Sequence, residues 1–350
     1  MSSNKEFVET MGERIDSLVN LDVPSRNVTS ILYPLAREKS QGPLCLSAAS
    51  VLQKTIHPQD VIFIATGFTE RPDVTPEIGE TDGPPGAAAL ARALHRGLGA
   101  VPIILVEEQF VGGISCVMQA AGFRVLSPDE AMAATRSFAS IHVAAVTSFP
   151  TDIKEAKKRA RELIKKYKPA SIVVIEKAGM NEKEVIHGSF GTRNDAIAKV
   201  DYLVIEATRE NIVTIGIGDG GNEVGMGLIQ EGLKQSSIPF IAKCKCGCGG
   251  GIACTTSTDI LVTAAVSNWG AYGVAACLAA LLDMADVFHS AVVEETMLQA
   301  AAYASFIDSE TGYVMPPGVD GLASPVHQAL VTLLSEIVTQ GLRFMKKEGS

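Results

Sequence analysis

The sequence is short of the features that mark nucleic-acid-binding and membrane proteins. Only 30 of its 350 residues are Lys or Arg, against 39 Asp or Glu, so the formal net charge is −9. A phosphate-binding surface needs clustered positive charge. The longest uncharged run, residues 260–282, is interrupted by the polar segment 267–270, which favours a buried strand, a turn and a buried helix over a membrane span. We therefore expect no nucleic-acid partner and no membrane-spanning segment.

Targeting and nucleotide-binding signals are also missing. The first 14 residues carry three glutamates and no apolar core, unlike a secretory signal or an acid-poor transit peptide. The motif G-x-x-x-x-G-K-[ST] is absent, and we interpret G-I-G-D-G-G as departing from the dinucleotide spacing G-x-G-x-x-G. We expect a cytoplasmic protein that is neither a kinase nor a Rossmann dehydrogenase and uses no nucleotide cofactor.

The cysteines do not form a disulfide pattern. Their number is odd at seven, and four of them, Cys244, Cys246, Cys248 and Cys254, crowd into one glycine-rich stretch. Such density suggests thiolate metal ligation, but C-x-C-x-C lacks the usual paired C-x-x-C spacing. We do not expect three cysteines in five residues to converge on one tetrahedral ion. A reduced surface loop is the interpretation we adopt, with structural zinc as the alternative.

The remaining pattern predicts an α/β fold. Charged residues make up only 20% and aromatic residues 5%, a balance typical of closely packed helices and parallel strands. Short β-branched runs alternate with helical patterns, which predicts a mostly parallel central sheet flanked by helices. We divide the chain into an N-terminal helical layer, residues 1–55, packed on an α/β domain, residues 56–350. The expected strands are 61–65, 101–106, 124–126, 141–148, 171–175, 212–218 and 260–266. We also expect a helix over 226–235 and a hairpin over 307–322.

The run I-G-I-G-D-G-G-N-E-V-G-M-G organises the rest of the chain. It follows a buried strand and surrounds Asp219, Asn222 and Glu223 with glycines. Glycine lets a ligand approach the main chain closely, as at Gly220 and Gly221. For a single Asp-Gly pair, an ordinary capping turn would be the better interpretation. For the whole run we favour a site.

A second candidate lies where a long polar loop leads into a helix, residues 86–97. Glu80, Thr81 and Asp82 stand just before it, and a helix N-terminus offers free N–H groups and a positive dipole end to a carboxylate. These residues are equally consistent with simple helix capping. We expect the Asp82 segment and the glycine-rich turn to converge.

Further polar residues follow other predicted strands. In a parallel sheet their carboxyl ends meet at one edge, where ligands bind. Several carboxylates there would repel one another unless a proton or a cation intervened, and oxygen ligands suit magnesium or manganese better than zinc. Arg193 would match a carboxylate bidentately, whereas a lone loop histidine such as His187 is more commonly solvated. The additional candidates are Thr66, Gly67, Glu176, Asn268 and Asp320.

Five segments, in this order, resemble the D-glutamate cyclase family. They are F-I-A-T-G-F, G-E-T-D-G-P-P-G-A, the glycine-rich run, V-S-N-W-G-A-Y and V-D-G-L, and together they cover residues 60–325. The resemblance implies a hydro-lyase that converts D-glutamate, a small acidic amino acid, to 5-oxo-D-proline and water. It also offers the mitochondrial matrix as an alternative location, because the family includes a mitochondrial protein. A homo-oligomer is compatible with the sequence.

For such a reaction we assign hypothetical roles to the candidate residues. Asp219 and Glu223 would act as base and acid or bind a divalent ion, with Glu176 and Asp320 as further metal ligands. N–H groups of the glycine turn would stabilise an oxyanion. Asp82 would orient the ammonium group, and Arg193 would hold the α-carboxylate. Another small-acid lyase, hydratase or racemase on the same scaffold, or a non-catalytic metabolite-binding protein, are the alternatives. The remaining substrate-binding candidates are Thr66, Gly67, Thr81, Gly220, Gly221, Asn222 and Asn268.

Overall fold

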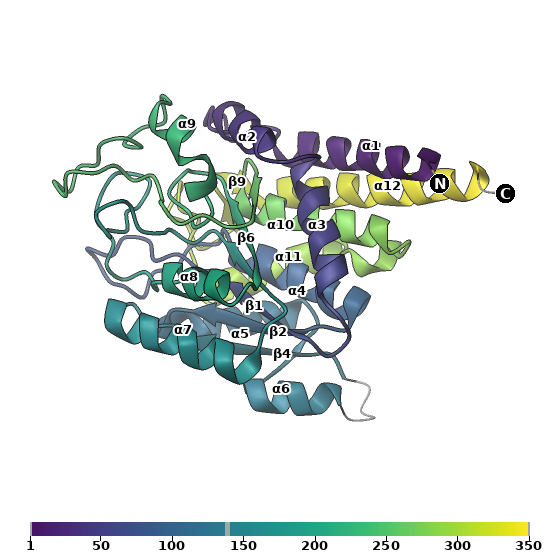
Figure 1. Ribbon diagram of the computed structural model, residues 1–350, viewed down its shortest axis with the longest axis horizontal. Coiled ribbons are helices and arrows are strands. Elements are labelled where there is room, and N and C mark those ends of the chain that lie inside the picture. Colours follow the sequence, from purple (N-terminus) through teal and green to yellow (C-terminus); the bar gives the residue numbers. More distant parts are fainter. Residues whose placement is uncertain (1, 137–140, 349–350) are drawn as a thin grey trace.

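The computed structural model describes residues 2–136 and 141–348 and shows an α/β fold built on one parallel sheet (Figure 1). Seven strands pair in the order β3-β4-β2-β1-β5-β6-β7, and every pair is parallel. The predicted fold class is therefore confirmed. The strands are β1 (Val61–Ala65), β2 (Val101–Val106), β3 (Arg124–Leu126), β4 (Val143–Ser148), β5 (Ser171–Ile175), β6 (Val213–Gly218) and β7 (Ile260–Thr263).

The central strands are buried on both faces. All residues of β1, β2 and β5 are buried, which explains why they appear in the sequence as continuous apolar runs without alternation. Arg124 in the edge strand β3 is exposed. Helices on both sides of the sheet provide this burial.

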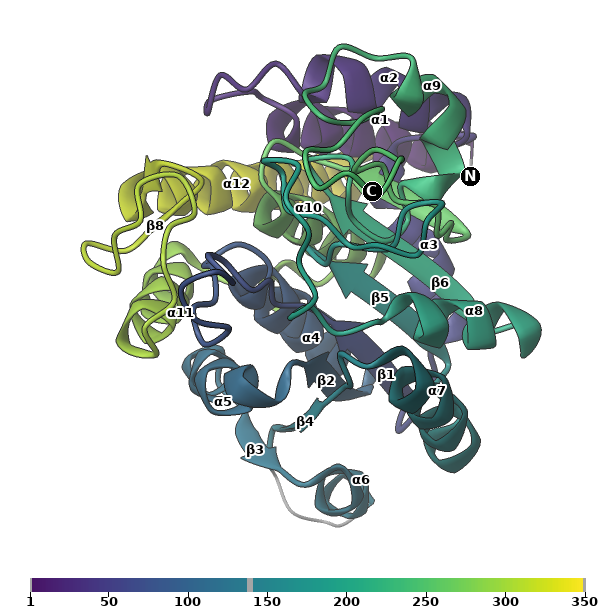
Figure 2. The ribbon, with the colours of Figure 1, turned by 90° about the vertical axis from the view of Figure 1, so that its left-hand side faces the viewer.

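Figure 2 shows the two helical layers. Helices α7 (Ile153–Tyr167) and α8 (Asp201–Arg209) lie against one face, and α4 (Pro84–Leu98) and α10 (Ser267–Leu281) lie on the other. The remaining helices are α1 (Ser2–Val19), α2 (Thr29–Glu38), α3 (Leu44–Thr55), α5 (Val111–Ala120), α6 (Pro128–Thr135), α9 (Gln230–Lys234), α11 (Ala291–Tyr303) and α12 (Ser324–Glu348), with 3₁₀ turns at Glu108–Phe110, Gly227–Ile229 and Ala285–Val287.

Three local predictions differ from the structure. The polar segment 267–270, expected as a turn, forms the first turn of α10, and β7 ends earlier than predicted, at Thr263. The helix expected over 226–235 is only a 3₁₀ turn followed by the five-residue α9. The predicted hairpin after residue 307 contains just two short antiparallel strands, β8 (Gly318–Val319) and β9 (Leu322–Ala323).

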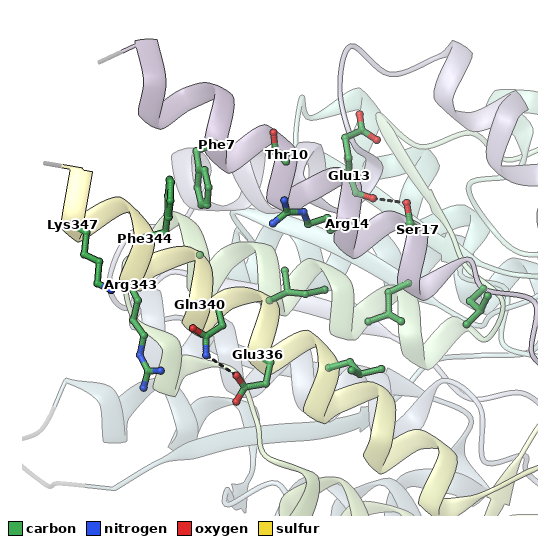
Figure 3. Close-up of a pocket in the computed structure, with 15 residues that line it drawn as sticks. Phe7, Thr10, Glu13, Arg14, Ser17, Glu336, Gln340, Arg343, Phe344 and Lys347 are labelled. Atoms are coloured by element: carbon green, nitrogen blue, oxygen red, sulfur yellow. Dashed lines mark hydrogen bonds between the residues drawn. The ribbon is translucent and has the colours of Figure 1, made fainter.

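The N-terminal and C-terminal helices lie side by side, and both chain ends are at the same corner of the molecule (Figure 1). A groove of about 1230 Å³ runs between α1 and α12, where Phe7 stacks on Phe344 with ring centroids 5.0 Å apart (Figure 3). Its acidic residues, Glu13 and Glu336, are not buried. The groove lacks the polar cluster that chemistry on a small acid requires, so we place the site elsewhere. Whether the chain forms a homo-oligomer stays a prediction.

No helix in the two described ranges combines the length and the apolar character that crossing a membrane would require.

Candidate active site

The order in which the chain adds strands to the sheet reverses between β1 and β5. From β1 the chain continues to β2 on one side, and from β5 it continues to β6 on the other. The crevice outside the carboxyl ends of strands at such a switch point is the usual ligand site of an open α/β sheet. Thr66 follows β1, Glu176 follows β5 and Asp219 follows β6, so the sheet brings these three positions to one edge.

Six carboxyl groups are buried at or beside this edge, and each residue is at most 8% exposed. Five of them form two groups in which one oxygen of each residue lies within 4.8 Å of the others. Asp219 belongs to both groups, so the predicted convergence of the glycine turn with the Asp82 segment is present. The first group is Asp82, Asp219 and Asp320; the second is Glu176, Asp219 and Glu223; the sixth carboxyl belongs to Glu80.

Arg26 supplies positive charge to the cluster, although no motif in the sequence marks it as a site residue. It lies in the connection between α1 and α2. Its Nη2 donates to Asp219 Oδ2 at 2.7 Å and lies 3.3 Å from Asp320 Oδ2. The same nitrogen donates to the carbonyl of Ala265. The N-terminal layer therefore reaches into the edge of the sheet and contributes directly to the site.

Glu223 organises the glycine-rich turn. Its Oε1 accepts the N–H groups of Asp219 at 3.1 Å and Gly220 at 2.6 Å, and its Oε2 accepts that of Gly221 at 2.7 Å. These three N–H groups are thus paired with a carboxylate of the same turn. In this state they do not provide the oxyanion site that the sequence suggested.

The glycines at 216, 218 and 221 do have the spacing G-x-G-x-x-G. In a dinucleotide site, this turn leads straight into a helix whose N-terminus binds the pyrophosphate. Here the chain continues from Gly221 through irregular backbone to the 3₁₀ turn at Gly227–Ile229. With its N–H groups already donated to Glu223, the turn is built around an acidic residue and not as a phosphate site.

Asp82 and Asn268 fix the two helices that meet at the cluster. Asp82 accepts the N–H groups of Ser267 at 2.9 Å and Asn268 at 2.8 Å, at the start of α10. Asn268 Oδ1 accepts those of Gly83 at 3.0 Å and Gly86 at 2.7 Å, at the start of α4. Asp82 therefore caps α10 and not the helix that follows it in sequence, α4, whose capping was the alternative interpretation. These contacts also position the carboxyl of Asp82 beside Asp219.

Burial and mutual repulsion raise the pKa values of the acids in the cluster. Burial first, and then the Asp219 charge, raise the pKa of Asp82 to about 8 and that of Glu223 to about 7. The same two causes raise the pKa of Glu176 well above its usual value, and burial does so for Asp320 against the opposing effect of Arg26. The cluster therefore retains protons near neutral pH.

Two of these acids also sit on unusual backbone. Glu176 has φ of 44° and Asp320 has φ of 53°, in the left-handed region that non-glycine residues seldom occupy. Such conformations cost about 1–3 kcal/mol each and persist where surrounding contacts enforce them, often at functional sites. The hydroxyl of Ser267 donates to Glu176 and that of Ser309 donates to Asp320 at 3.2 Å, so both side chains are held in place.

A small cavity of about 60 Å³ opens between these groups. Among the described residues that line it, Arg26 is the one basic side chain, while Ser189 and Phe190 border it from the loop after β5. The acidic side chains in its lining are Glu70, Glu80, Glu176, Asp219, Glu223, Glu310 and Asp320.

Comparison with known proteins assigns the family. Residues 15–335 match the family model described as D-glutamate cyclase-like, C-terminal. The chain belongs to this family. The match begins inside α1 and ends inside α12, so it includes Arg26 as well as the whole acidic cluster.

A curated relative of the family is the human (Homo sapiens) protein named "D-glutamate cyclase, mitochondrial", which is 29% identical over 276 residues. The aligned region covers 75% of this chain but only 38% of the human protein. The word mitochondrial applies to that relative. A cytoplasmic location for this family member stays a prediction.

The other predicted site residues are placed less centrally in this family member. Thr66 and Gly67 direct their carbonyls to the ammonium of Lys177, which is fully buried and pairs with Glu107 at 2.5 Å. The hydroxyl of Thr81 donates to the carbonyl of Gly318 at 2.6 Å. These contacts support the strand ends from beneath the cluster.

The structure does not bring Arg193 to the cluster. Its side chain is 57% exposed and pairs with Asp195 at 2.7 Å. Asn222 lines the cavity and donates to the carbonyl of His187 at 3.0 Å. His187 itself is fully buried, which contradicts the expectation of a solvated loop histidine.

Proposed function

We propose that the protein is a D-glutamate cyclase, a carbon–oxygen hydro-lyase that converts D-glutamate to 5-oxo-D-proline and water. The α-amine forms a bond to the γ-carboxyl carbon, one carbon–oxygen bond breaks, and the oxygen leaves as water. The buried acidic cluster that contains Arg26 is the observation that carries the proposal. The family and the name of the human relative support the choice of substrate.

The reaction makes two demands that a cluster of acids in mixed protonation states would meet. The ammonium must lose a proton before the nitrogen can attack, and the departing oxygen must gain protons. An ionised carboxylate serves as the base and a protonated carboxyl as the acid. Because the pKa of Glu223 is raised to about 7 and that of Asp82 to about 8, both forms coexist near neutral pH. We propose Asp219 as the base, with Glu223 as the acid.

A divalent cation fits the same residues. Glu176, Asp219 and Glu223 can direct one oxygen each to a common point, and Asp320 lies in the adjoining group. All these ligands are oxygens, which suits magnesium or manganese. Such an ion would mask the charge of the substrate's γ-carboxylate and make its carbon more electrophilic. Because carboxylates bind the ion in the deprotonated form, metal binding is the alternative to the role of Glu223 as proton donor.

For the substrate's α-carboxylate we propose Arg26. A guanidinium carries five N–H donors, and the contacts to Asp219, Asp320 and Ala265 all involve the single nitrogen Nη2. Arg26 lines the cavity, whereas Arg193 is an exposed residue paired with Asp195. One arginine at a fixed distance from the base would select one enantiomer by fixing the carboxylate, the amine and the side chain of the substrate.

The deciding experiment is incubation of the purified protein with D-glutamate and L-glutamate, followed by chiral separation of 5-oxoproline. We expect product from the D enantiomer. Asp219→Asn should lower kcat by at least about 100-fold, whereas Asp129→Asn, at an exposed position on α6, should not. Glu223→Gln is a less specific test of catalysis, because an amide cannot accept all three turn N–H groups and the turn itself would be disturbed.

Two other results would replace the proposal. Turnover of a different amino or hydroxy acid, without 5-oxoproline from glutamate, would identify another lyase, hydratase or racemase on this scaffold. Thermal stabilisation by D-glutamate without any product would identify a metabolite-binding protein.

A further inference from the structure

We propose that His187, Cys244, Cys246 and Cys248 form a structural zinc site outside the acidic cluster. The expectation that three cysteines in five residues would not converge is wrong. One ligand atom from each of the four residues lies within 4.8 Å of all the others. The proposal does not depend on the reaction that the acidic cluster performs.

The distances match a tetrahedral zinc site. Cys244 Sγ lies 3.4 Å from Cys246 Sγ and 3.5 Å from Cys248 Sγ, and His187 Nε2 lies 3.2 Å and 3.7 Å from the Cys246 and Cys248 sulfurs. With Zn–S near 2.3 Å and Zn–N near 2.0–2.1 Å, ideal tetrahedral separations are about 3.8 Å for S···S and about 3.6 Å for S···N. A disulfide would instead need sulfurs about 2.05 Å apart.

The backbone of the loop brings the sulfurs together. In an extended strand, side chains at i and i+2 share a face but are nearly 7 Å apart along the chain. Gly247 and Gly249 alternate with the cysteines and adopt φ of 78° and 83°, a conformation that glycine tolerates. These turns fold Cys244, Cys246 and Cys248 into a tight loop whose sulfurs point to one centre.

The fourth ligand comes from a distant part of the chain. His187 is fully buried, and its Nε2 has thiol sulfurs as its neighbours. Thiols are weak hydrogen-bond partners, so burial of an imidazole nitrogen against them is costly unless a metal bonds to it. Cys254, the other cysteine of the stretch, is buried and faces the carbonyl of Thr256. It does not belong to the group.

A Cys₃His site uses all four tetrahedral positions for protein ligands and leaves none for substrate. This closed coordination is typical of structural zinc. Thiolate and imidazole ligands also select zinc over magnesium or manganese, which the oxygen-only acidic cluster prefers. The two clusters would therefore take different metals.

The zinc site would hold together two loops that border the acidic cavity. Besides the ligands, the loops share a backbone hydrogen bond from Lys245 N to Gly191 O at 2.9 Å. Ser189 and Phe190 lie between His187 and Gly191 and line the cavity. The carbonyl of His187 accepts from Asn222, next to the acidic Glu223. Zinc would thus fix one wall of the proposed active site without touching substrate.

The experiment measures zinc directly. The full chain is stripped with a chelator, offered one equivalent of Zn²⁺, desalted and analysed for zinc, iron and manganese. We expect about one zinc per chain, and loss of most of it in the double variant Cys246→Ser/Cys248→Ser. Cys116→Ser is the matched control, because Cys116 is an exposed cysteine on α5 outside the cluster, and it should retain the zinc.

Cobalt keeps the test valid if the double variant does not fold. Co²⁺ added to the stripped wild-type chain should give intense thiolate-to-metal charge-transfer absorption and the visible bands of a tetrahedral ion, and Zn²⁺ should displace both. Hydrogen exchange of residues 186–194 and 240–251 should slow when zinc binds. A wild-type chain that retains no zinc, gives no thiolate absorption with cobalt, or retains iron instead would overturn the proposal.

Discussion

Asp82 and Asn268 cap each other's helices. The carboxylate of Asp82 accepts N–H groups at the start of α10, and the amide oxygen of Asn268 accepts N–H groups at the start of α4. The amide nitrogen of Asn268 also donates to the carbonyl of Thr81 at 3.1 Å. This reciprocal arrangement joins the two helices beside the acidic cluster, so the stability of the fold and the position of Asp82 depend on the same contacts.

Removal of the Asn268 side chain should therefore be costly. Asn268→Ala leaves the N–H groups of Gly83 and Gly86 without their acceptor in a buried region, and we expect a loss of about 2–4 kcal/mol in the free energy of unfolding. Urea denaturation measures it. Thr332→Ala, at an exposed position of α12, should change stability by less than about 0.5 kcal/mol. Equal stability of the Asn268 variant and wild type would refute the capping role.

The close approach of α4 and α10 gives a second prediction. A Cβ at Gly86 would lie 2.8 Å from Asn268 Oδ1 and 2.9 Å from Asn268 Cα, whereas a Cβ at Gly112 in α5 would meet nothing within 4 Å. We expect Gly86→Ala to destabilise by about 1–3 kcal/mol because a backbone atom must move. Gly112→Ala should be neutral or stabilise by up to about 1 kcal/mol.

Thermal and urea unfolding of the two variants, side by side, test this contrast. Both substitutions add one methyl group to a helical glycine, so their helix propensities change alike. The difference between them isolates the contact with Asn268. Similar effects of the two substitutions on stability would count against the close approach.

The two arginines provide a test of where substrate binds. We expect Arg26→Gln to raise KM for D-glutamate at least about tenfold, since a charged hydrogen bond to a carboxylate contributes about 1.5–3 kcal/mol. Arg193→Ala should change KM less than about twofold, because this side chain is exposed and paired with Asp195. Circular dichroism and thermal unfolding control for folding. The reverse pattern, with KM raised only by Arg193→Ala, would return substrate binding to the loop after β5.

The sheet and half of the site could be predicted from the sequence because they depend on local signals. Buried parallel strands appear as short β-branched runs, and the residue after such a run must lie at the carboxyl edge of the sheet. Glu176 and Asp219 follow from this rule, and glycine turns and helix entrances marked Glu223 and Asp82. None of these inferences depends on how distant segments of the chain pack.

The residues that the sequence did not indicate are brought to their sites only by the packing of distant segments. Arg26 sits in an ordinary turn between two helices, and it reaches Asp219, 193 positions away, only because the N-terminal layer lies over the strand ends. His187 is 59 positions from Cys246. No spacing rule relates a single histidine to a C-x-C-x-C stretch at that separation, so the sequence alone does not indicate the fourth proposed zinc ligand. Arg193 is the arginine that the sequence favours because a guanidinium matches a carboxylate bidentately, but its exposure depends on packing.

The protonation of the cluster gives a pH dependence with a definite sign. Burial raises the pKa of Asp82 from 3.8 to about 8, so the folded state holds a proton that the unfolded state releases. Between these two values the folded state binds more protons, and the free energy of unfolding falls as pH rises. We therefore expect the protein without a divalent ion in the cluster to lose stability from pH 5 to pH 8.

Glu176→Gln removes one of these titrating groups, because burial also raises the pKa of Glu176 well above its usual value. The variant should flatten the decline by up to about 1.4 kcal/mol per pH unit. Glu295→Gln, at an exposed position on α11, is the control and should follow wild type. Unfolding curves at each pH, with one equivalent of Zn²⁺ present throughout, measure the effect. A decline as steep in Glu176→Gln as in wild type would contradict it.

If the cluster binds a divalent ion, added metal should oppose the loss of stability at higher pH. Carboxylate ligands must be deprotonated, so Mn²⁺ binding releases the protons that Glu176 and Glu223 retain. We expect Mn²⁺ to raise the midpoint of thermal unfolding more at pH 8 than at pH 6, and to restore cyclisation to a protein that was stripped with a chelator and refilled with zinc only. Zinc is returned first because the proposed thiolate site would otherwise unfold the cavity wall and mimic a catalytic defect. Full turnover with zinc alone would leave the acids as proton carriers and remove the metal from the mechanism.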